Sequence, residues 1–147
     1  MTTPIGPAKK NSQKGTTIVE AAIILLTFLT LLFAVFEAGR FMNAGQVVTN
    51  AAREGARFAV TPLTQTNILP TDGEIETRVQ DYLTSAGLPC SGCVTVTRPT
   101  VTTGAVDTSF TQVVVTHDYQ VITVPGLFSM LEITMNGEAL MRNETSN

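Results

Sequence analysis

The chain has 147 residues, of which 44% are apolar and only 14% are charged, and its formal net charge is −3. This length allows one modest domain and one further segment, and so low a charged fraction suits a membrane-attached chain better than a fully soluble domain. The sequence contains no basic patch with interleaved aromatic residues, so we expect no nucleic-acid partner.

The N-terminal segment MTTPIGPAKKNSQKG, residues 1–15, is polar and contains two prolines and two glycines, so we expect it to be disordered. It holds all three lysines of the chain, Lys9, Lys10 and Lys14, whereas the residues beyond 36 contain six arginines and eleven acids. A basic segment before an apolar run keeps the N-terminus on the cytoplasmic side of a membrane. We therefore predict a cytoplasmic leader at 1–15 and an exported region at 37–147.

Residues 16–36 predict a transmembrane helix. The uncharged run from Ala21 onward is 16 residues long, or about 24 Å of helix, and the length rises to about 31 Å when the helix starts at Thr16. The span is therefore long enough if Glu20 lies just inside its cytoplasmic edge. A cleaved secretory signal is the alternative, but residues 34–40, AVFEAGR, offer no small-x-small cleavage site.

The helical pattern continues beyond the span to about Val60, because no proline interrupts it. Glu37 and Arg40, spaced i, i+3 at the outer membrane boundary, are predicted interfacial anchors. The glycines at positions 39, 45 and 55 each cost about 1 kcal/mol relative to alanine in a helix, so we expect another backbone to approach closely. A small apolar stripe contains Phe41, Gly45, Val48, Ala52, Gly55 and Ala59, opposite a polar stripe of Asn43, Gln46, Asn50, Arg53 and Arg57.

A second, short helix is predicted from Thr71 to Gly87. Thr71 and Glu74 have the spacing of a capping box, and Pro89 follows the C-terminal glycine. The apolar residues of this helix recur at helical spacing and predict one buried face. That face comprises Ile75, Val79, Tyr82, Leu83 and Ala86.

Beyond this helix the apolar residues recur at every second position, which predicts strands. Three strands with one apolar face need a cover, and the small stripe of the long helix is the expected one. The predicted fold class is therefore α+β, with a long N-terminal helix, one short helix and a three-stranded antiparallel sheet packed on the long helix. The predicted strands are VTVTRPT (94–100), TQVVVTHDYQVIT (111–123) and EITMNGEALMRNE (132–144), separated by TTGAVDTS and VPGLFSML. The apolar face of the middle strand comprises Val113, Val115, Tyr119 and Val121. The apolar face of the last strand comprises Ile133, Met135, Ala139 and Met141.

Cys90 and Cys93 form a C-x-x-C pattern. A zinc site would lack ligands, because His117 is the only histidine. An exported location favours a disulfide, and a thiol-exchange motif normally lies at a helix N-terminus, whereas here Pro89 precedes the pair and a strand follows. A structural disulfide is the favoured interpretation, with a redox motif and free thiols as alternatives. We recognise no catalytic set or phosphate loop, and predict no enzymatic activity, cofactor, metal or small-molecule substrate.

Glu20 is the only acid at the cytoplasmic edge of the span. A carboxylate at the bilayer centre costs roughly 2.5–3.5 kcal/mol on insertion scales, and less towards the interface. In one interpretation Glu20 marks the interfacial end of the span. In the other, cleavage after Gly15 turns Thr16 into an N-terminal ammonium, which pairs with the Glu20 carboxylate of a neighbouring copy and fixes the stagger of the two chains.

Three stretches of the sequence also resemble known proteins. GTTIVEAA (15–22) is similar to the processing site of type IV pilin-like proteins. EAGR (37–40) and TNAAREGARFA (49–59) resemble the TadE-like family of minor pseudopilins from tight-adherence (Tad, or Flp) pilus systems. The resemblance is specific from residue 15 to 60 and loose beyond. Ala21 stands where major Flp pilins usually carry an aromatic residue, which favours a minor pseudopilin.

The resemblance implies cleavage after Gly15 by a prepilin peptidase, retention in the bacterial inner membrane, and pilus assembly with other pilins or pseudopilins. It also implies a subunit contact at Arg53, Glu54 and Arg57, whereas the residues alone indicate a solvated face with a weak helix pair. The alternative function is a single-span anchor for an exported adhesion or binding module that has no role in a pilus.

Overall fold

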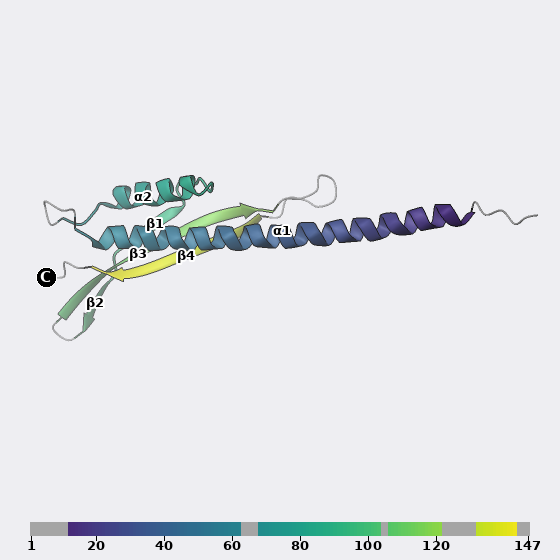
Figure 1. Ribbon diagram of the computed structural model, residues 1–147. Helices are drawn as coiled ribbons and strands as arrows, with labels where there is room; N and C mark the ends of the chain where they lie inside the picture. Colours follow the sequence, from purple (N-terminus) through teal and green to yellow (C-terminus); the bar gives the residue numbers. More distant parts are fainter. Residues whose placement is uncertain (1–11, 63–67, 104–105, 122–131, 144–147) are drawn as a thin grey trace, which may run out of the picture. The chain divides into compact units, whose positions relative to one another are not determined.

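The computed structural model describes residues 12–62, 68–103, 106–121 and 132–143, which form two helices and four strands (Figure 1). The chain divides into two units, Met1–Ala38 and Gly39–Asn147, and we call the second unit the head. Most of the predicted leader and the whole VPGLFSML separator lie outside the described residues. The elements are α1 (Ser12–Val60), α2 (Asp72–Ser85), β1 (Val94–Thr97), β2 (Thr100–Thr103), β3 (Val106–Gln120) and β4 (Glu132–Arg142).

Helix α1 begins at Ser12, four residues before Thr16, where the transmembrane helix was predicted to begin. The expectation of a disordered segment was therefore wrong for residues 12–15. Each residue added to the end of an existing helix gains a backbone hydrogen bond without a new nucleation cost, and this outweighs the cost of about 1 kcal/mol for Gly15. Polar composition alone does not end a helix.

Every side chain of α1 from residue 15 to 36 is exposed, and nearly all of those beyond Glu20 are apolar. The hydroxyl groups of Thr27 and Thr30 donate to the carbonyl oxygens of Ile23 and Leu26, four residues earlier, at 2.9 and 2.8 Å. A helix that is apolar on all sides is typical of a membrane span. Within the described part of the chain, α1 is the one helix long and apolar enough to cross a membrane, as predicted.

The predicted capping box at the start of α2 is confirmed. The Thr71 hydroxyl accepts from the Glu74 backbone N–H at 3.4 Å, and the Glu74 carboxylate accepts from the Thr71 N–H at 2.7 Å. The buried face, however, consists only of Ile75, Val79 and Leu83. Tyr82 and Ala86 were predicted to be buried and are exposed, because the contact surface of so short a helix is one narrow i, i+4 stripe.

The sheet has four antiparallel strands, and not the predicted three. The long strand β3 lies in the middle, with β1 and β2 on one side and β4 on the other. The predicted first strand, 94–100, ends at Thr97, and β2 begins at Thr100 and runs into the predicted separator TTGAVDTS, which also contains the start of β3. Strand β2 is exposed along its whole length. The sequence pattern does not indicate β2, because a strand without a buried face has no apolar alternation.

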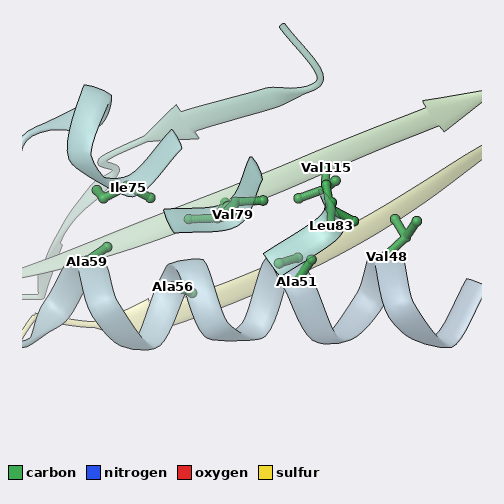
Figure 2. Packing of buried hydrophobic residues seen from close by; sticks show 10 residues of the cluster. Val48, Ala51, Ala56, Ala59, Ile75, Val79, Leu83 and Val115 are labelled. Carbon is green, nitrogen blue, oxygen red and sulfur yellow. The ribbon is translucent and has the colours of Figure 1, made fainter. Parts of the chain in front are cut away.

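The core of the head lies between α1, α2 and the apolar face of the sheet, as predicted (Figure 2). Small residues of α1 meet branched residues of α2 and β3, which lets the helix lie close to both. A smaller cluster of Ala44, Tyr119 and Met135 continues this core along α1. The main cluster contains Val48, Ala51, Ala52, Ala56 and Ala59 of α1, Ile75, Val79 and Leu83 of α2, and Val113 and Val115 of β3.

The glycines explain how closely these elements approach. A Cβ atom on Gly55 would lie 2.5 Å from a methyl group of Val79, and one on Gly137 of β4 would lie 2.6 Å from the Val48 carbonyl oxygen. The predicted close approach of a second backbone therefore occurs, but the glycine that permits it is Gly137, on the strand. A Cβ atom built on Gly39 would have no atom of the described chain within 4 Å. The close contact that was expected to offset the cost of this glycine is therefore absent among the described residues.

Candidate functional site

The predicted processing residues lie in the first turns of α1. Gly15, Thr16 and Glu20 are all exposed, and no atom lies within 4 Å of the position that a Gly15 side chain would occupy. In the described part of the chain no cationic side chain forms an ion pair with Glu20. Lys9 and Lys10 lie outside the described residues, as does the side chain of Lys14.

Arg40 lies in the first turn of that part of α1 which belongs to the head. Its guanidinium carbon lies 5.6 Å from the centroid of the Tyr119 ring, and the Phe41 ring meets the same ring edge-on, with centroids 5.5 Å apart. A cation over an aromatic face is stabilised by about 0.5–1 kcal/mol at exposed sites. Tyr119 is buried in β3, so the sheet fixes the direction of Arg40. The sequence predicted an anchoring role for Glu37 and Arg40 but did not indicate Tyr119 as a partner.

The predicted subunit contact contains an internal ionic link. Oε1 of Glu54 lies 2.9 Å from Nη2 of Arg57, one turn along α1, and 2.9 Å from Nη2 of Arg78 on α2. The hydrogen bond from Arg78 and then that from Arg57 lower the pKa of Glu54, against the opposing effect of partial burial. The helix pair expected within α1 is present, and Arg78 adds a link to α2 that the sequence pattern did not indicate. Arg53 is exposed and points away from this link.

This link should make the stability of the head depend on pH. The folded-state pKa of Glu54 is below its ordinary value of 4.5, so the stabilisation is present above that pH and is lost as the pH falls below it. We expect Glu54→Gln to cost less than about 1 kcal/mol at neutral pH, because both arginines are exposed. Thermal unfolding of the full chain in detergent between pH 3 and 7 measures this, with Glu76→Gln as the control. A pH profile that Glu54→Gln leaves unchanged would contradict the assignment.

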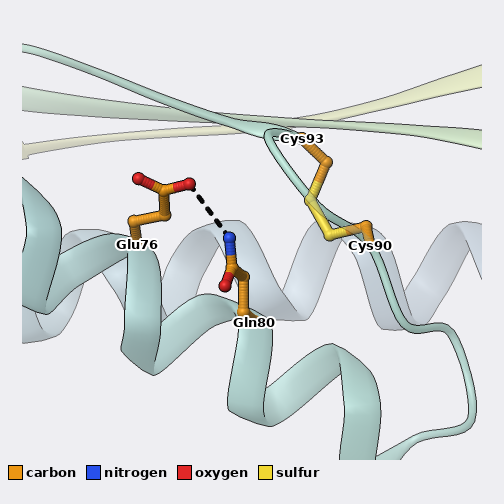
Figure 3. Close-up of a disulfide and its surroundings, with 4 residues drawn as sticks. All are labelled: Glu76, Gln80, Cys90 and Cys93. Atoms are coloured by element: carbon orange, nitrogen blue, oxygen red, sulfur yellow. Dashed lines mark hydrogen bonds between the residues drawn. A yellow bond between two sulfur atoms is a disulfide. The ribbon is translucent and has the colours of Figure 1, made fainter.

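Cys90 and Cys93 are bonded in the turn between α2 and β1 (Figure 3). Gly92 between them has φ +67°, a left-handed conformation that glycine adopts without strain. Both cysteines pack against the core, and the Cys93 carbonyl oxygen accepts from the Thr116 N–H at 2.8 Å, so the bonded turn holds the start of β1 beside β3. His117 and Asp118 of β3 alternate between the two faces of the sheet, with His117 half-buried and Asp118 exposed.

An open groove of about 770 Å³ runs between α1 and β4. Its α1 wall extends from Phe41 to Arg53, and its β4 wall is formed by residues 134–136. Arg53 is the one charged residue that the described part of the chain contributes to its lining, and Phe41 and Met42 are 37% and 66% exposed beside it. The sequence placed Arg53 on a polar helix stripe but gave no indication of the groove, because the groove depends on the position of β4 against α1.

Comparison with known proteins gives one match. Residues 15–57 match a family model described as TadE-like protein. The resemblance inferred from the sequence is thereby confirmed over these residues. No curated protein and no solved structure matches the chain. A TadE-like segment that contains an apolar helix of membrane-spanning length indicates a membrane protein associated with a Tad pilus.

Proposed function

We propose that this chain, whose residues 15–57 form a TadE-like segment, is a minor pseudopilin that acts in the assembly of a Tad pilus. It is a single-pass protein of the bacterial inner membrane, with a cytoplasmic N-terminus and an exported head. The proposal is supported by the position of the family match along the chain. The match begins at Gly15 and includes Glu20 and the exposed apolar part of α1. It continues into the small-residue part of α1 that contributes to the core of the head.

In the proposed mechanism, a prepilin peptidase cuts the bond after Gly15 and releases Thr16 as a new N-terminal ammonium. Glu20 lies four residues farther along α1, about 6 Å of helix rise. In a neighbouring copy shifted by one turn, the ammonium reaches this carboxylate, and the pair offsets the cost of holding both charges near lipid. The apolar sides of α1 then associate laterally, so proteolytic maturation permits assembly.

The first test is the mature N-terminus. Mass spectrometry of protein isolated from its native membrane should find a chain that begins at Thr16, because the exposed Gly15 backbone is accessible to a membrane protease. Cells that lack the peptidase provide the control and should retain Met1. A native chain that still begins at Met1 in cells with an active peptidase would contradict the maturation step.

The second candidate function is a plain membrane anchor for an adhesion or binding module, and the large exported head favours it. Replacement of residues 16–36 by an unrelated apolar span separates the two functions. An anchored module keeps its surface location and binding after this replacement, whereas a pseudopilin no longer supports pilus formation because the specific pairing residues are gone.

A further inference from the structure

Helix α1 of the head is covered on two sides and open on a third. The sheet covers one side, and Gly55 faces Val79 of α2 on the next. Arg53 is two residues before Gly55 and therefore lies about 200° around the helix from it, on the far flank. That flank is the wall of the groove beside β4, and no described residue of the chain covers it.

The groove and α2 carry complementary charge. Among the residues that the structure describes, Arg53 is the only charged side chain that lines the groove, and the amides of Gln46, Asn50 and Asn136 add hydrogen-bond donors beside it. Helix α2, DGEIETRVQDYLTS, contains four acids and one arginine. Three of those acids have partners: Asp72 pairs with Arg98, Glu74 belongs to the capping box, and Glu76 accepts from Gln80 (Figure 3).

The fourth acid, Asp81, is exposed and forms no ion pair with any residue that the structure describes. The same is true of Arg53. Two unpaired exposed charges of opposite sign, on opposite flanks of one head, cannot reach each other within a single copy. They can meet between two copies that lie side by side.

The two charges also lie at the same level along α1. Arg78 bonds Glu54 of α1, Val79 lies against Gly55, and Leu83 lies beside Ala51 (Figure 2). Because α2 runs in the opposite direction to α1, Asp81 stands at the level of residue 53. Two heads at equal height therefore present Asp81 of one and Arg53 of the other to each other. The Thr16–Glu20 pair of the proposed mechanism needs a shift of one turn, so that pair joins a different neighbouring copy.

We propose that the groove between α1 and β4 receives α2 of a second copy of this chain, with Asp81 of that copy paired to Arg53. The contact joins two different surfaces, so it repeats from copy to copy in the same direction and does not close as a twofold dimer does. Copies anchored in one membrane have their helices parallel, as such a contact requires. The proposal deepens the proposed function, on which it rests for this common orientation, by naming the partner surface of the head.

The test uses the full chain in its native membrane, produced in two copies with different tags. A photo-cross-linking amino acid replaces Asn50, which is exposed in the groove. After irradiation we expect an adduct that contains both tags, in which residue 50 of one copy is joined to the peptide 72–85 of the other. Arg53→Glu and Asp81→Arg should each reduce the adduct at least tenfold, and the two substitutions combined should restore it. Arg142→Glu reverses an exposed charge on β4 outside the groove and should leave it unchanged.

Each other outcome overturns the proposal: no adduct, an adduct with a different protein, or an adduct that Arg53→Glu does not reduce. Circular dichroism of the variants confirms that the exposed substitutions leave the fold intact. The test also separates this contact from the proposed function. Normal pili without the adduct refute the contact alone, whereas a charge-dependent adduct between chains that keep Met1 supports the contact and refutes the maturation step.

Discussion

A Glu20→Ala variant should be cut after Gly15 as efficiently as the wild-type chain and should fail to enter a pilus. The substitution leaves Gly15 and Thr16 in place and makes the span more apolar, so membrane insertion and cleavage have no reason to weaken. In the proposed mechanism, what is lost is the partner of the new Thr16 ammonium. Breaking one half of an ion pair held away from water costs about 3–5 kcal/mol, because the remaining charge stays unpaired.

A loss of this size for each contact accumulates over every neighbouring pair, so we expect no measurable pili. Electron microscopy of the cells counts the pili, and mass spectrometry of the same cells confirms the Thr16 terminus. Glu37→Ala removes a carboxylate at the other end of the predicted span and should leave piliation near normal. Pili at wild-type numbers in the Glu20→Ala strain would remove the argument that Glu20 sets the stagger.

Gly137→Val should unfold the head or lower its thermal midpoint by 10 °C or more, about 2–3 kcal/mol for a domain of this size. A Cβ atom at this position would lie 2.6 Å from the Val48 carbonyl oxygen, 2.8 Å from its carbon and 3.0 Å from the Thr49 Cα. These are backbone atoms of a regular helix, so they cannot rotate away as a flexible side chain does. The strand and the helix must separate, and the core between them opens.

Gly73→Ala is the matched control, because nothing lies within 4 Å of its new methyl group and the residue is in α2. Alanine is favoured over glycine in a helix by about 0.8–1 kcal/mol, so this variant should melt slightly later than the wild type. Unfolding of the full chain in detergent, followed by near-ultraviolet circular dichroism, reports the head. Equal midpoints for Gly137→Val and the wild type would show that α1 and β4 do not approach as closely as described.

The sequence predicted those parts of the fold whose signal is local. The long helix, the capping box at Thr71 and the alternation in β3 and β4 each depend on residues a few positions apart, and all three are present. The fourth strand β2 was missed because its side chains are exposed on both faces and carry no apolar period. The sequence pattern did not single out Gly137, since the role of this residue depends on a helix about 90 residues earlier in the chain.

The candidate sites divide in the same way. The TadE-like segment and the C-x-x-C turn are each contiguous in sequence and could be recognised there. The link from Glu54 to Arg78 and the contact of Arg40 with Tyr119 join residues from different elements, and only the packing of those elements brings them together. The groove could not be predicted from the sequence at all, because it is defined by a flank of α1 that nothing in the described chain covers.

The head takes half of its main hydrophobic core from α1, at Val48, Ala51, Ala52, Ala56 and Ala59. The same helix carries the apolar span, without a break in the backbone hydrogen bonding between them. A protease that cuts after Ala59 would therefore leave behind all five residues, which α2 and β3 cannot replace, and the detached piece would unfold. Release of a head with both core clusters intact therefore requires cleavage upstream of Ala44.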